Sequence, residues 1–357
     1  MARKYSAAVR SVRVGACLVA VLLVTACAPG GAGTKPPTVP PSAFHRGILY
    51  VSWQAGEYAS GESDATLADV VQPLGVNWIG LVVTCYQSAA TATQIECGTS
   101  RTATDDDLAH AIDTAHRLGL KVLLKPHIDP EDYPTHWRGD IGFGNDTAAW
   151  RAWFGSYTAF ITHYATLARA TGADAFVVGT ELQGTSGHTA EWRAVITGVR
   201  AVYSGSLTYA ANQGEEMRIQ WWDALDMIGV DAYYALTQRN DPTLAQLRSA
   251  WKPIVARLRD LASRWKRPIL LTEVGYQSAD GANRAPWGVE SHTVDMQEQA
   301  QCYQAVFDAF ADQPWLFGIF WWNILPKRDQ GGPFDTDYTP IGKPAAEVVR
   351  GNFLTPP

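Results

Sequence analysis

Residues 175–182 read Ala-Phe-Val-Val-Gly-Thr-Glu-Leu, an apolar run that is interrupted by a glutamate near its end. Both faces of such a run are apolar, which is typical of a strand buried inside a parallel sheet. Burying a carboxylate is unfavourable unless the group is paired, hydrogen-bonded or placed at a polar cleft. The segment from Leu271 to Glu273 repeats the arrangement. We therefore expect Glu181 and Glu273 to lie at a polar cleft where two buried strands end.

Eight strand–helix units follow one another along the chain. The expected strands are Gly47–Trp53, Trp78–Tyr86, Lys121–Ile128, Ala175–Leu182, Leu207–Asn212, Met227–Tyr234, Pro268–Tyr276 and Phe317–Ile324. The expected helices are Asp64–Leu74, Asp105–Leu118, Thr147–Ala170, Thr189–Val202, Trp221–Leu225, Pro242–Arg264, Val294–Ala311 and Lys343–Val349. This alternation predicts an α/β fold, a single (β/α)8 TIM barrel over residues 44–357. A doubly wound open sheet is the alternative, although its G-x-G-x-x-G signature is absent after the first strand.

The N-terminal residues have the pattern of a processing signal. Four basic residues precede an apolar run from Val14 to Val24, which is shorter than the about 20 residues that a membrane span needs. Val24-Thr25-Ala26-Cys27 resembles the bacterial lipobox, so we expect a lipoprotein signal peptide at 1–26 and lipidation of Cys27. A flexible tether at 27–43, rich in Gly, Pro, Ser and Thr, would follow. The expected location is the bacterial cell membrane, facing the periplasm or exterior. An ordinary signal peptide with an incidental cysteine is the alternative.

Composition excludes several classes of protein. Of 357 residues, 46% are hydrophobic and 18% are charged, so the chain can bury a core and is not intrinsically disordered. Removing the predicted signal leaves 25 basic against 35 acidic residues, a formal charge of −10, which argues against nucleic-acid binding. Cys85 and Cys97 flank a Ser/Thr/Ala-rich loop, and their spacing leaves open whether they form a disulfide. Cys302 is expected to be a buried thiol. No metal-site spacing is present, and no cofactor is implied.

The strand ends carry the candidate chemistry, because TIM barrels place their active sites at the C-terminal ends of the strands. Two carboxylates across a cleft suit glycoside hydrolysis, in which one acts as acid and base and the other attacks the sugar. The alternative is that each glutamate is a structural ion-pair partner, for example of Lys125. Other polar or aromatic candidates for substrate binding at strand ends are Trp53, Lys125, His127, Asn212, Asp231 and Tyr233.

The chain has 14 tryptophans, more than its core requires. Flat aromatic rings stack against the C–H faces of sugars, so tryptophans near strand ends predict a sugar-binding surface. Trp321 and Trp322 both lie at such an end, but side chains alternate along a strand, so only one faces the cleft; we favour Trp322. Loop residues Trp137 and Trp287 are further candidates. Packing is the expected role of the tryptophans in helices, which are Trp150, Trp153, Trp192, Trp251 and Trp265.

An ordered set of segments resembles glycoside hydrolase family 113, a member of the retaining clan A. The segments are Leu124–Asp129, Gly179–Leu182, Leu207–Asn212, Ile228–Tyr234 and Leu271–Tyr276. Known members of the family are mainly β-1,4-mannanases. The resemblance implies endo-β-1,4-mannanase activity by double displacement, with Glu181 as acid/base and Glu273 as nucleophile. Most of the clan has asparagine before the acid/base, where it holds the sugar 2-hydroxyl. Thr180 stands there in this chain, and Asn212 is a candidate replacement.

Other functions stay open. Xylan, β-glucan or galactan are rival substrates, and a catalytically inactive carbohydrate-binding lipoprotein is an alternative. A solute-binding lipoprotein would need two lobes, and no break in composition divides the chain. An enzyme of this class needs an ionised nucleophile, so we expect Lys125 and either Tyr233 or Tyr234 to donate to Glu273. Glu181 needs a drier setting or a nearby negative charge. The expected partner is a β-linked oligo- or polysaccharide, and the expected state is a monomer.

Overall fold

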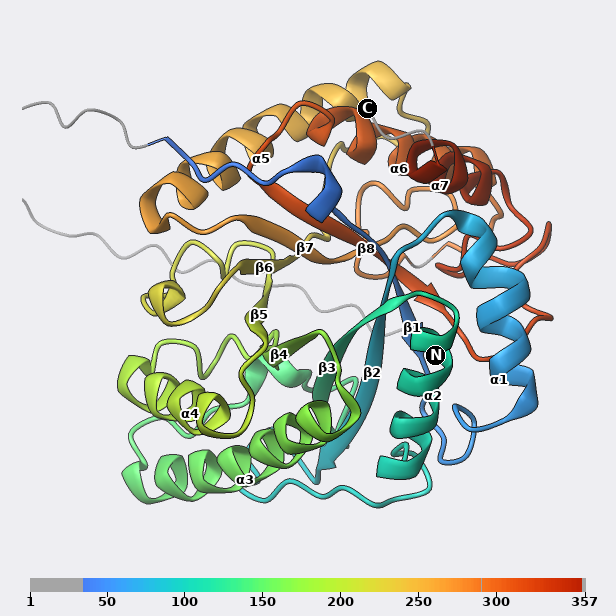
Figure 1. The fold of residues 1–357 in the computed structure, drawn as a ribbon. Coiled ribbons are helices and arrows are strands. Elements are labelled where there is room, and N and C mark those ends of the chain that lie inside the picture. The colour runs from blue at the N-terminus through green and yellow to red at the C-terminus, as the bar shows by residue number, and fades with distance from the viewer. Residues whose placement is uncertain (1–34, 290, 355–357) are drawn as a thin grey trace, which may run out of the picture. The chain divides into compact units, whose positions relative to one another are not determined.

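The computed structural model describes residues 35–289 and 291–354. The predicted signal at 1–26, Cys27 and the first part of the predicted tether lie outside these residues. Within them, eight parallel strands close into a barrel in chain order, as Figure 1 shows, which confirms the predicted TIM barrel. The strands are β1 (His45–Val51), β2 (Trp78–Gln87), β3 (Lys121–Pro130), β4 (Ala175–Thr180), β5 (Ser206–Asn212), β6 (Ile228–Asp231), β7 (Ile269–Val274) and β8 (Leu316–Ile324).

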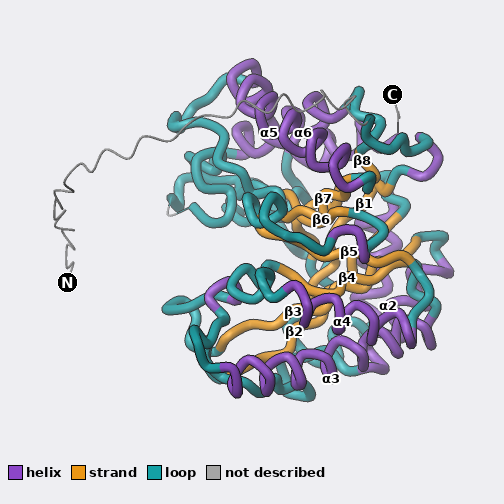
Figure 2. The backbone as a smooth tube through the Cα atoms, turned by 90° about the vertical axis from the view of Figure 1, so that its left-hand side faces the viewer, coloured by secondary structure: helices purple, strands orange, loops and turns teal. Residues whose placement is uncertain are grey.

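Helices surround the strands on the outside of the barrel (Figure 2). They are α1 (Gly61–Thr66), α2 (Asp105–Arg117), α3 (Thr147–Thr171), α4 (Thr189–Val202), α5 (Leu244–Trp265), α6 (Met296–Phe310) and α7 (Pro344–Leu354). A single 3-10 turn at Trp222–Ala224 stands between β5 and β6. Gly119 and Gly172 adopt left-handed φ values of 76° and 75°, which fits their predicted positions just after helix ends.

The first expected helix, Asp64–Leu74, is irregular. It begins as α1, widens into a π-helical turn at Leu67–Val71 and ends in a 3-10 turn at Gln72–Leu74. Proline at position 73 has no backbone N–H to donate to an α-helical ladder, and Gly75 then reverses the chain with φ 78°. The sequence pattern therefore located this element correctly but not its helical type.

Four strands, β1, β4, β6 and β7, end two or three residues earlier than the sequence pattern predicted, and β4 and β6 do so at candidate site residues. β4 ends at Thr180 because Glu181 has a positive φ of 54°, which turns the chain out of the extended conformation. β6 ends at Asp231, although the N–H of Ala232 still donates to the carbonyl of Glu273 at 2.7 Å. In both of these strands the candidate site residues therefore lie at the end of the ladder or directly beyond it.

Apolar side chains fill the inside of the barrel. Phe320 on β8 is fully buried there, and the glycines of neighbouring strands leave room for its ring. A Cβ atom on Gly47 would lie 2.3 Å from Phe320 Cδ1, closer than atoms can approach. His45 stacks on Trp78 with ring centroids 3.8 Å apart, and its burial lowers the pKa of His45 to about 3. The inner core consists of Leu49, Val51, Trp78, Val82, Leu123, Ala175, Val177, Ala210, Met227, Leu270 and Phe320.

A larger core lies between the strands and the helices. The helical tryptophans belong to it, as predicted: Trp153, Trp192 and Trp251 are buried, and Trp150 and Trp265 pack against it while partly buried. This layer holds the helices against the barrel, because large aromatic side chains bury extensive apolar surface.

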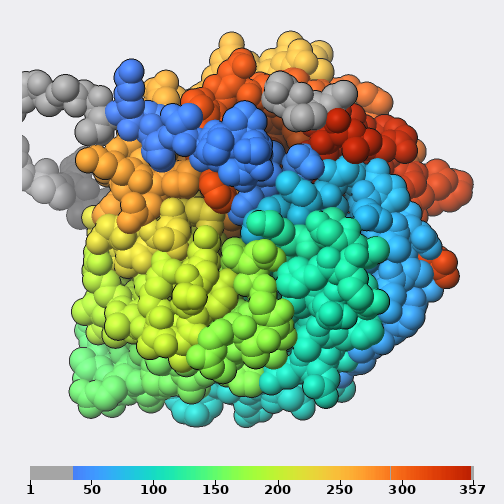
Figure 3. Space-filling view, in the orientation of Figure 1, coloured from blue at the N-terminus to red at the C-terminus, as the bar shows by residue number. Residues whose placement is uncertain are grey.

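The described part of the predicted tether lies against the barrel. Figure 3 shows the segment that begins at residue 35 lying across the surface beside the C-terminal part of the chain. The N–H of Val39 donates to the carbonyl of Pro314 at 2.6 Å, and a 3-10 turn at Pro41–Ala43 leads into β1. Among the described residues, no helix is both long enough and apolar enough to span a membrane.

Cys85 and Cys97 form a disulfide, which settles the question that the sequence left open. Cys85 is buried at the C-terminal end of β2, and Cys97 lies in the exposed loop that follows. Tyr86 and Glu96, the neighbours of these cysteines, pair in an isolated antiparallel bridge. The disulfide thus fastens the loop after β2 to the barrel. Cys302 is a buried free thiol, as predicted.

Removing the disulfide should destabilise the folded protein. For a loop of this size we expect Cys97→Ser to lower the free energy of unfolding by about 3 kcal/mol, measured by urea denaturation. A reducing agent should lower the stability of the wild-type protein to the level of the variant and leave the variant unchanged. Equal stability of the reduced and oxidised wild-type protein would contradict this expectation.

Candidate active site

A cavity of about 840 Å³ lies at the C-terminal ends of the barrel strands. The residues that line it lie at the ends of the strands from β2 to β8 or in the segments that follow them, including the loops after β2, β3 and β7. The lining residues are Tyr86, Arg101, Asp129, Pro130, Glu131, Tyr133, Trp137, Arg138, Glu181, Asn212, Gln213, Tyr233, Glu273, Trp287, Trp322 and Tyr338. Glu181 and Glu273 thus share one cavity, and the volume suits a site that encloses a small ligand or a segment of a longer one.

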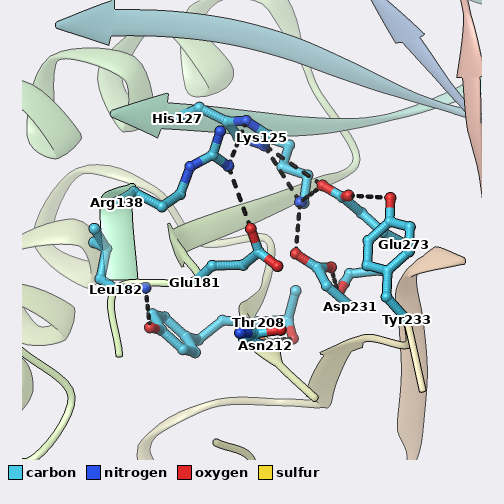
Figure 4. Close-up of polar contacts among 12 residues, drawn as sticks. Lys125, His127, Arg138, Glu181, Leu182, Thr208, Asn212, Asp231, Tyr233 and Glu273 are labelled. Atoms are coloured by element: carbon cyan, nitrogen blue, oxygen red, sulfur yellow. Dashed lines mark hydrogen bonds and ion pairs between the residues drawn. The ribbon is translucent and has the colours of Figure 1, made fainter. Parts of the chain in front are cut away.

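Lys125 makes the central polar contacts of the site (Figure 4). Its side chain is fully buried on β3, and its ammonium group donates to Glu273 Oε1 and, at 3.2 Å, to Asp231 Oδ2. The other oxygen of Asp231 accepts from the Thr272 hydroxyl at 2.7 Å. Burial, reinforced by the charge of Glu273, raises the pKa of Asp231 well above its usual range, while Lys125 acts against this rise. A buried ammonium group of this kind is tolerated only when carboxylates pair with it.

Tyr233 supplies a second donor to Glu273. Its hydroxyl donates to Glu273 Oε2 at 2.7 Å, so both oxygens of this carboxylate accept hydrogen bonds. Of the two tyrosines that the sequence left open, Tyr234 instead donates to Glu216 at 2.8 Å. Donors on both oxygens stabilise the charged form of a carboxylate. The Glu273 side chain is only 5% exposed.

Glu181 has a different environment. Its side chain is 15% exposed, and no donor in the described part of the chain hydrogen-bonds to its carboxyl group; the nearest cation is Arg138, with Nη1 3.7 Å from Glu181 Oε2. Burial raises the pKa of Glu181 to about 7, against the charge of Arg138 and assisted by the charge of Glu273. A carboxyl group in this setting holds its proton near neutral pH.

Arg138 was not among the residues expected from the sequence. It lies in a 3-10 turn at Arg138–Asp140, in the irregular loop after β3. Its guanidinium group pairs with Asp129 Oδ1 at 2.7 Å and donates to His127 Nδ1 at 3.0 Å. Loop residues carry no strand or helix period, so the sequence offered no signal for this position beyond the loop itself.

His127 is buried between two cations. Its Nε2 lies 3.3 Å from Lys125 Nζ and 3.8 Å from Glu273 Oε1. Burial, together with the charges of Arg138 and Lys125, lowers the pKa of His127 well below its usual range, so the ring is neutral. Lys125, His127 and Asp231 were expected to bind substrate, but none lines the cavity. They surround Glu273 from the barrel side instead.

Asn212, by contrast, lines the cavity at the end of β5. Its side-chain oxygen accepts from the N–H of Gln213 at 2.8 Å, which orients the amide. Thr180, which stands where most of the clan has asparagine, is 2% exposed, and its hydroxyl has no hydrogen-bond partner among the described residues. The cavity therefore offers the amide of Asn212, and not Thr180, to a ligand.

The two adjacent tryptophans at the end of β8 point to opposite faces of the strand, as the alternation of side chains requires. Trp322 lines the cavity, parallel to the His127 ring with centroids 6.5 Å apart. The inclusion of Trp321 among the substrate-binding residues is wrong: it is fully buried and stacks on Tyr303 at 3.8 Å, outside the barrel wall. Trp53 is 40% exposed and lies edge-on to Trp322 at 6.5 Å, outside the cavity lining. Trp137 and Trp287 both line the cavity.

Other lining residues were also missed by the sequence interpretation. Arg101 lies over the ring of Tyr86 at 4.0 Å and pairs with Glu131. Tyr338, after β8, meets the ring of Tyr233 edge-on at 6.3 Å and donates to the carbonyl of Pro286 at 2.8 Å. All of these but Tyr86 lie in loops, where the sequence gives no periodic signal.

One acidic group lies apart from the cavity lining. Carboxylate oxygens of Asp241, Asp280 and Asp295 lie within 4.8 Å of one another, which is close enough for a cation by distance alone. Asp295 caps helix α6 and Asp280 accepts from Asn240, so both already have protein partners.

Solved structures resemble this chain closely. A complex of a GH113 β-1,4-mannanase superposes with a TM-score of 0.80 at 27% identity, covering 87% of this chain and 99% of that chain. The GH113 β-mannanase from Alicyclobacillus acidocaldarius, in complex with ManMIm, gives a TM-score of 0.78 at 34% identity, covering 87% and 97%. A family 5 mannosidase from Rhizomucor miehei, at 10% identity and a TM-score of 0.58 over 90% and 97%, shows the fold alone.

A search of curated protein sequences gives no match. The sequence profile described as Glycoside Hydrolase Family 113 matches residues 50–343, which include all eight strand ends and both glutamates of the cavity. On this match over most of its length, and on the structural likeness, the chain belongs to glycoside hydrolase family 113.

Proposed function

We propose that the protein is an endo-acting β-1,4-mannanase that retains anomeric configuration, with Glu273 as nucleophile and Glu181 as acid/base. The observation that carries the proposal is the contrast between the two carboxyl groups of one cavity. Glu273 accepts hydrogen bonds from Lys125 and Tyr233, whereas burial raises the pKa of Glu181 to about 7. Retaining glycosidases need this pair, one carboxyl group charged and the other protonated.

In the first step, a carboxylate oxygen of Glu273 attacks the anomeric carbon while the carboxyl group of Glu181 protonates the leaving glycosidic oxygen. The bond to the leaving sugar breaks, and a glycosyl ester forms on Glu273. In the second step, the Glu181 carboxylate takes a proton from water as that water attacks the anomeric carbon. The ester breaks, Glu273 leaves as a carboxylate, and Glu181 is again protonated.

Mannan is the favoured substrate because the GH113 structures that resemble this chain at 27% and 34% identity are described as β-1,4-mannanases. Trp322, Trp137 and Trp287 in the cavity lining support a sugar ligand, since their rings can stack on pyranose faces. Xylan, β-glucan and galactan are the rival substrates. A carbohydrate-binding protein without catalysis is disfavoured by the intact carboxyl pair.

We also propose that the protein is exported and anchored to the bacterial membrane through a lipid on Cys27. The basic n-region, the short apolar run and the lipobox-like Val24–Cys27 support export. The disulfide between Cys85 and Cys97 supports it independently, because disulfides persist in oxidising compartments.

The enzyme should hydrolyse β-1,4-linked manno-oligosaccharides in preference to xylo-, gluco- and galacto-oligosaccharides of the same length. Chromatography of the products identifies the sugar and the cleavage mode, and proton NMR should show the β-anomer as the first product. Glu273→Gln should lower kcat/KM by roughly 10⁴-fold, the scale expected when an essential catalytic side chain is removed.

Glu216→Gln is the matched control, because it makes the same change at a buried glutamate outside the cavity lining. It should retain most of the wild-type turnover. Near-full activity of Glu273→Gln would refute the proposed nucleophile, and an α-anomer as first product would refute double displacement. Preferred cleavage of another oligosaccharide would contradict mannan as the substrate but not the proposed roles of the two glutamates.

Activity should fall as the pH rises through about 7. Glu181 must be protonated to act as the acid, and the protonated fraction declines above its pKa, which burial raises to about 7. The pH profile of kcat/KM for an oligosaccharide measures this descending limb. Arg138→Gln removes a positive charge that favours the ionised carboxylate, so the limb should move to higher pH. A limb near pH 5, or one that moves to lower pH in the variant, would contradict the assignment.

Cys27→Ala should release the protein from the membrane fraction of the bacterium that produces it. Detergent-phase partitioning and mass spectrometry of the N-terminal residue measure anchoring and lipidation. Cys17→Ala changes a cysteine inside the predicted signal and should leave the protein anchored. Unchanged partitioning of Cys27→Ala would show that the lipid model is wrong.

A further inference from the structure

Glu181 has an unusual backbone conformation. Its φ is 54°, in the left-handed region that side-chain-bearing residues seldom adopt. Within the described ranges, Lys266 is the one other non-glycine residue with positive φ, and it caps the C-terminus of α5, where this conformation is common. Glu181 instead follows a strand. Such a conformation persists when surrounding contacts hold it in place.

The contacts that hold the Glu181 peptides come from β5. The N–H of Glu181 donates to the carbonyl of Ala210 at 2.8 Å. The next N–H, that of Leu182, donates to the hydroxyl oxygen of Tyr209 at 2.8 Å. The Tyr209 hydroxyl in turn donates to Glu215 Oε1 at 2.8 Å. Leu182, Tyr209 and Glu215 are all buried, so no water competes for these bonds.

Glu215 also reaches the cavity side of the strand end. Its second oxygen accepts from the N–H of Asn212 at 2.9 Å. A single buried carboxyl group therefore fixes the residue after the proposed acid/base, through Tyr209, and the cavity-lining Asn212 directly. Neither Tyr209 nor Glu215 lines the cavity.

We propose that Tyr209 and Glu215 are positioning residues for Glu181. They hold the Glu181–Leu182 peptide in the left-handed turn that directs the Glu181 carboxyl group into the cavity. Glu215 also fixes the backbone position of Asn212 relative to this carboxyl group. The inference rests on the proposed function, because it concerns proton donation by Glu181. The Tyr209 hydroxyl accepts a hydrogen bond from the Leu182 N–H and donates one to Glu215, so it is needed both as acceptor and as donor.

Tyr209→Phe tests the proposal, because it removes the hydroxyl and keeps the ring. The ring packs between Trp192 and Trp221, at centroid distances of 5.2 and 5.1 Å, and these contacts are retained. Hydrolysis of a manno-oligosaccharide needs the acid, so its kcat/KM should fall roughly 10- to 100-fold. A 2,4-dinitrophenyl β-mannobioside has a leaving group that needs no proton, so its kcat/KM should stay at the wild-type value while its kcat falls.

Tyr203→Phe is the matched control. It removes a buried hydroxyl that donates to the carbonyl of Ala173 at 2.7 Å, away from the cavity lining. This variant should leave kcat and kcat/KM for both substrates unchanged. An equal loss with both substrates, or no loss with either, in Tyr209→Phe overturns the proposal. Should the Tyr209→Phe variant fail to fold, Glu215→Gln decides by the same comparison, because it replaces one of the two accepting oxygens of Glu215 with an NH2 group, which donates.

Amide hydrogen exchange separates this inference from the proposed function. Exchange at Leu182 should speed up in Tyr209→Phe and not in Tyr203→Phe, whichever substrate the enzyme hydrolyses. If the wild-type protein hydrolyses no glycoside, the proposed function fails while the exchange result still decides whether Tyr209 holds this peptide. Unchanged exchange at Leu182 overturns the positioning role.

Discussion

One buried ammonium group, that of Lys125, organises the polar centre of the barrel. Its side chain is fully buried, and it contacts Glu273, Asp231 and His127. Removing one partner of a buried ion pair costs about 3–5 kcal/mol, because the remaining charge is left without compensation. The closed barrel supplies the compensation: Lys125 comes from β3, Asp231 from β6 and Glu273 from β7, and parallel closure brings these strand ends to the same rim. Without closure, the ammonium group and its carboxylates would not meet.

The two glutamates of the site differ in how closely a cation approaches them. Lys125 hydrogen-bonds directly to Glu273. The guanidinium group of Arg138 instead contacts Asp129 and His127, and its Nη1 lies 3.7 Å from Glu181 Oε2. Burial, together with the charges of these two cations, lowers the pKa of His127 and keeps its ring neutral. The ring therefore separates Lys125 from Arg138 without adding a third positive charge. Burial raises the pKa of Glu181 against the charge of Arg138, whereas Glu273 accepts hydrogen bonds from Lys125 and Tyr233.

The sequence predicted those features of the site that follow from the residue pattern of the strands. Short apolar runs that alternate with helical patterns identified the eight strands, and a glutamate after such a run stood out because desolvating a carboxylate is unfavourable. Alternation also showed that only one of Trp321 and Trp322 faces the cleft. Arg138 could not be predicted, because it belongs to a loop whose path depends on contacts with distant residues. Tyr209 and Glu215 were hidden for another reason: a buried tyrosine on a strand carries the same pattern whether it only packs or also orients a neighbour.

The tryptophan excess of the chain bears on catalysis in two places. Gly179, two residues before Glu181, has no room for a side chain: a Cβ atom there would lie 2.7 Å from Trp192 and 2.9 Å from Tyr209. The pairing of β4 with β5 shifts register between Val177 and Thr180, and Glu181 then turns with positive φ. Trp192 therefore packs against the strand end that carries Glu181. Trp192 and Trp221, stacked at 5.0 Å, both pack against the ring of Tyr209. Trp322 lines the cavity, while these buried tryptophans pack behind the backbone that carries Glu181, the proposed acid/base.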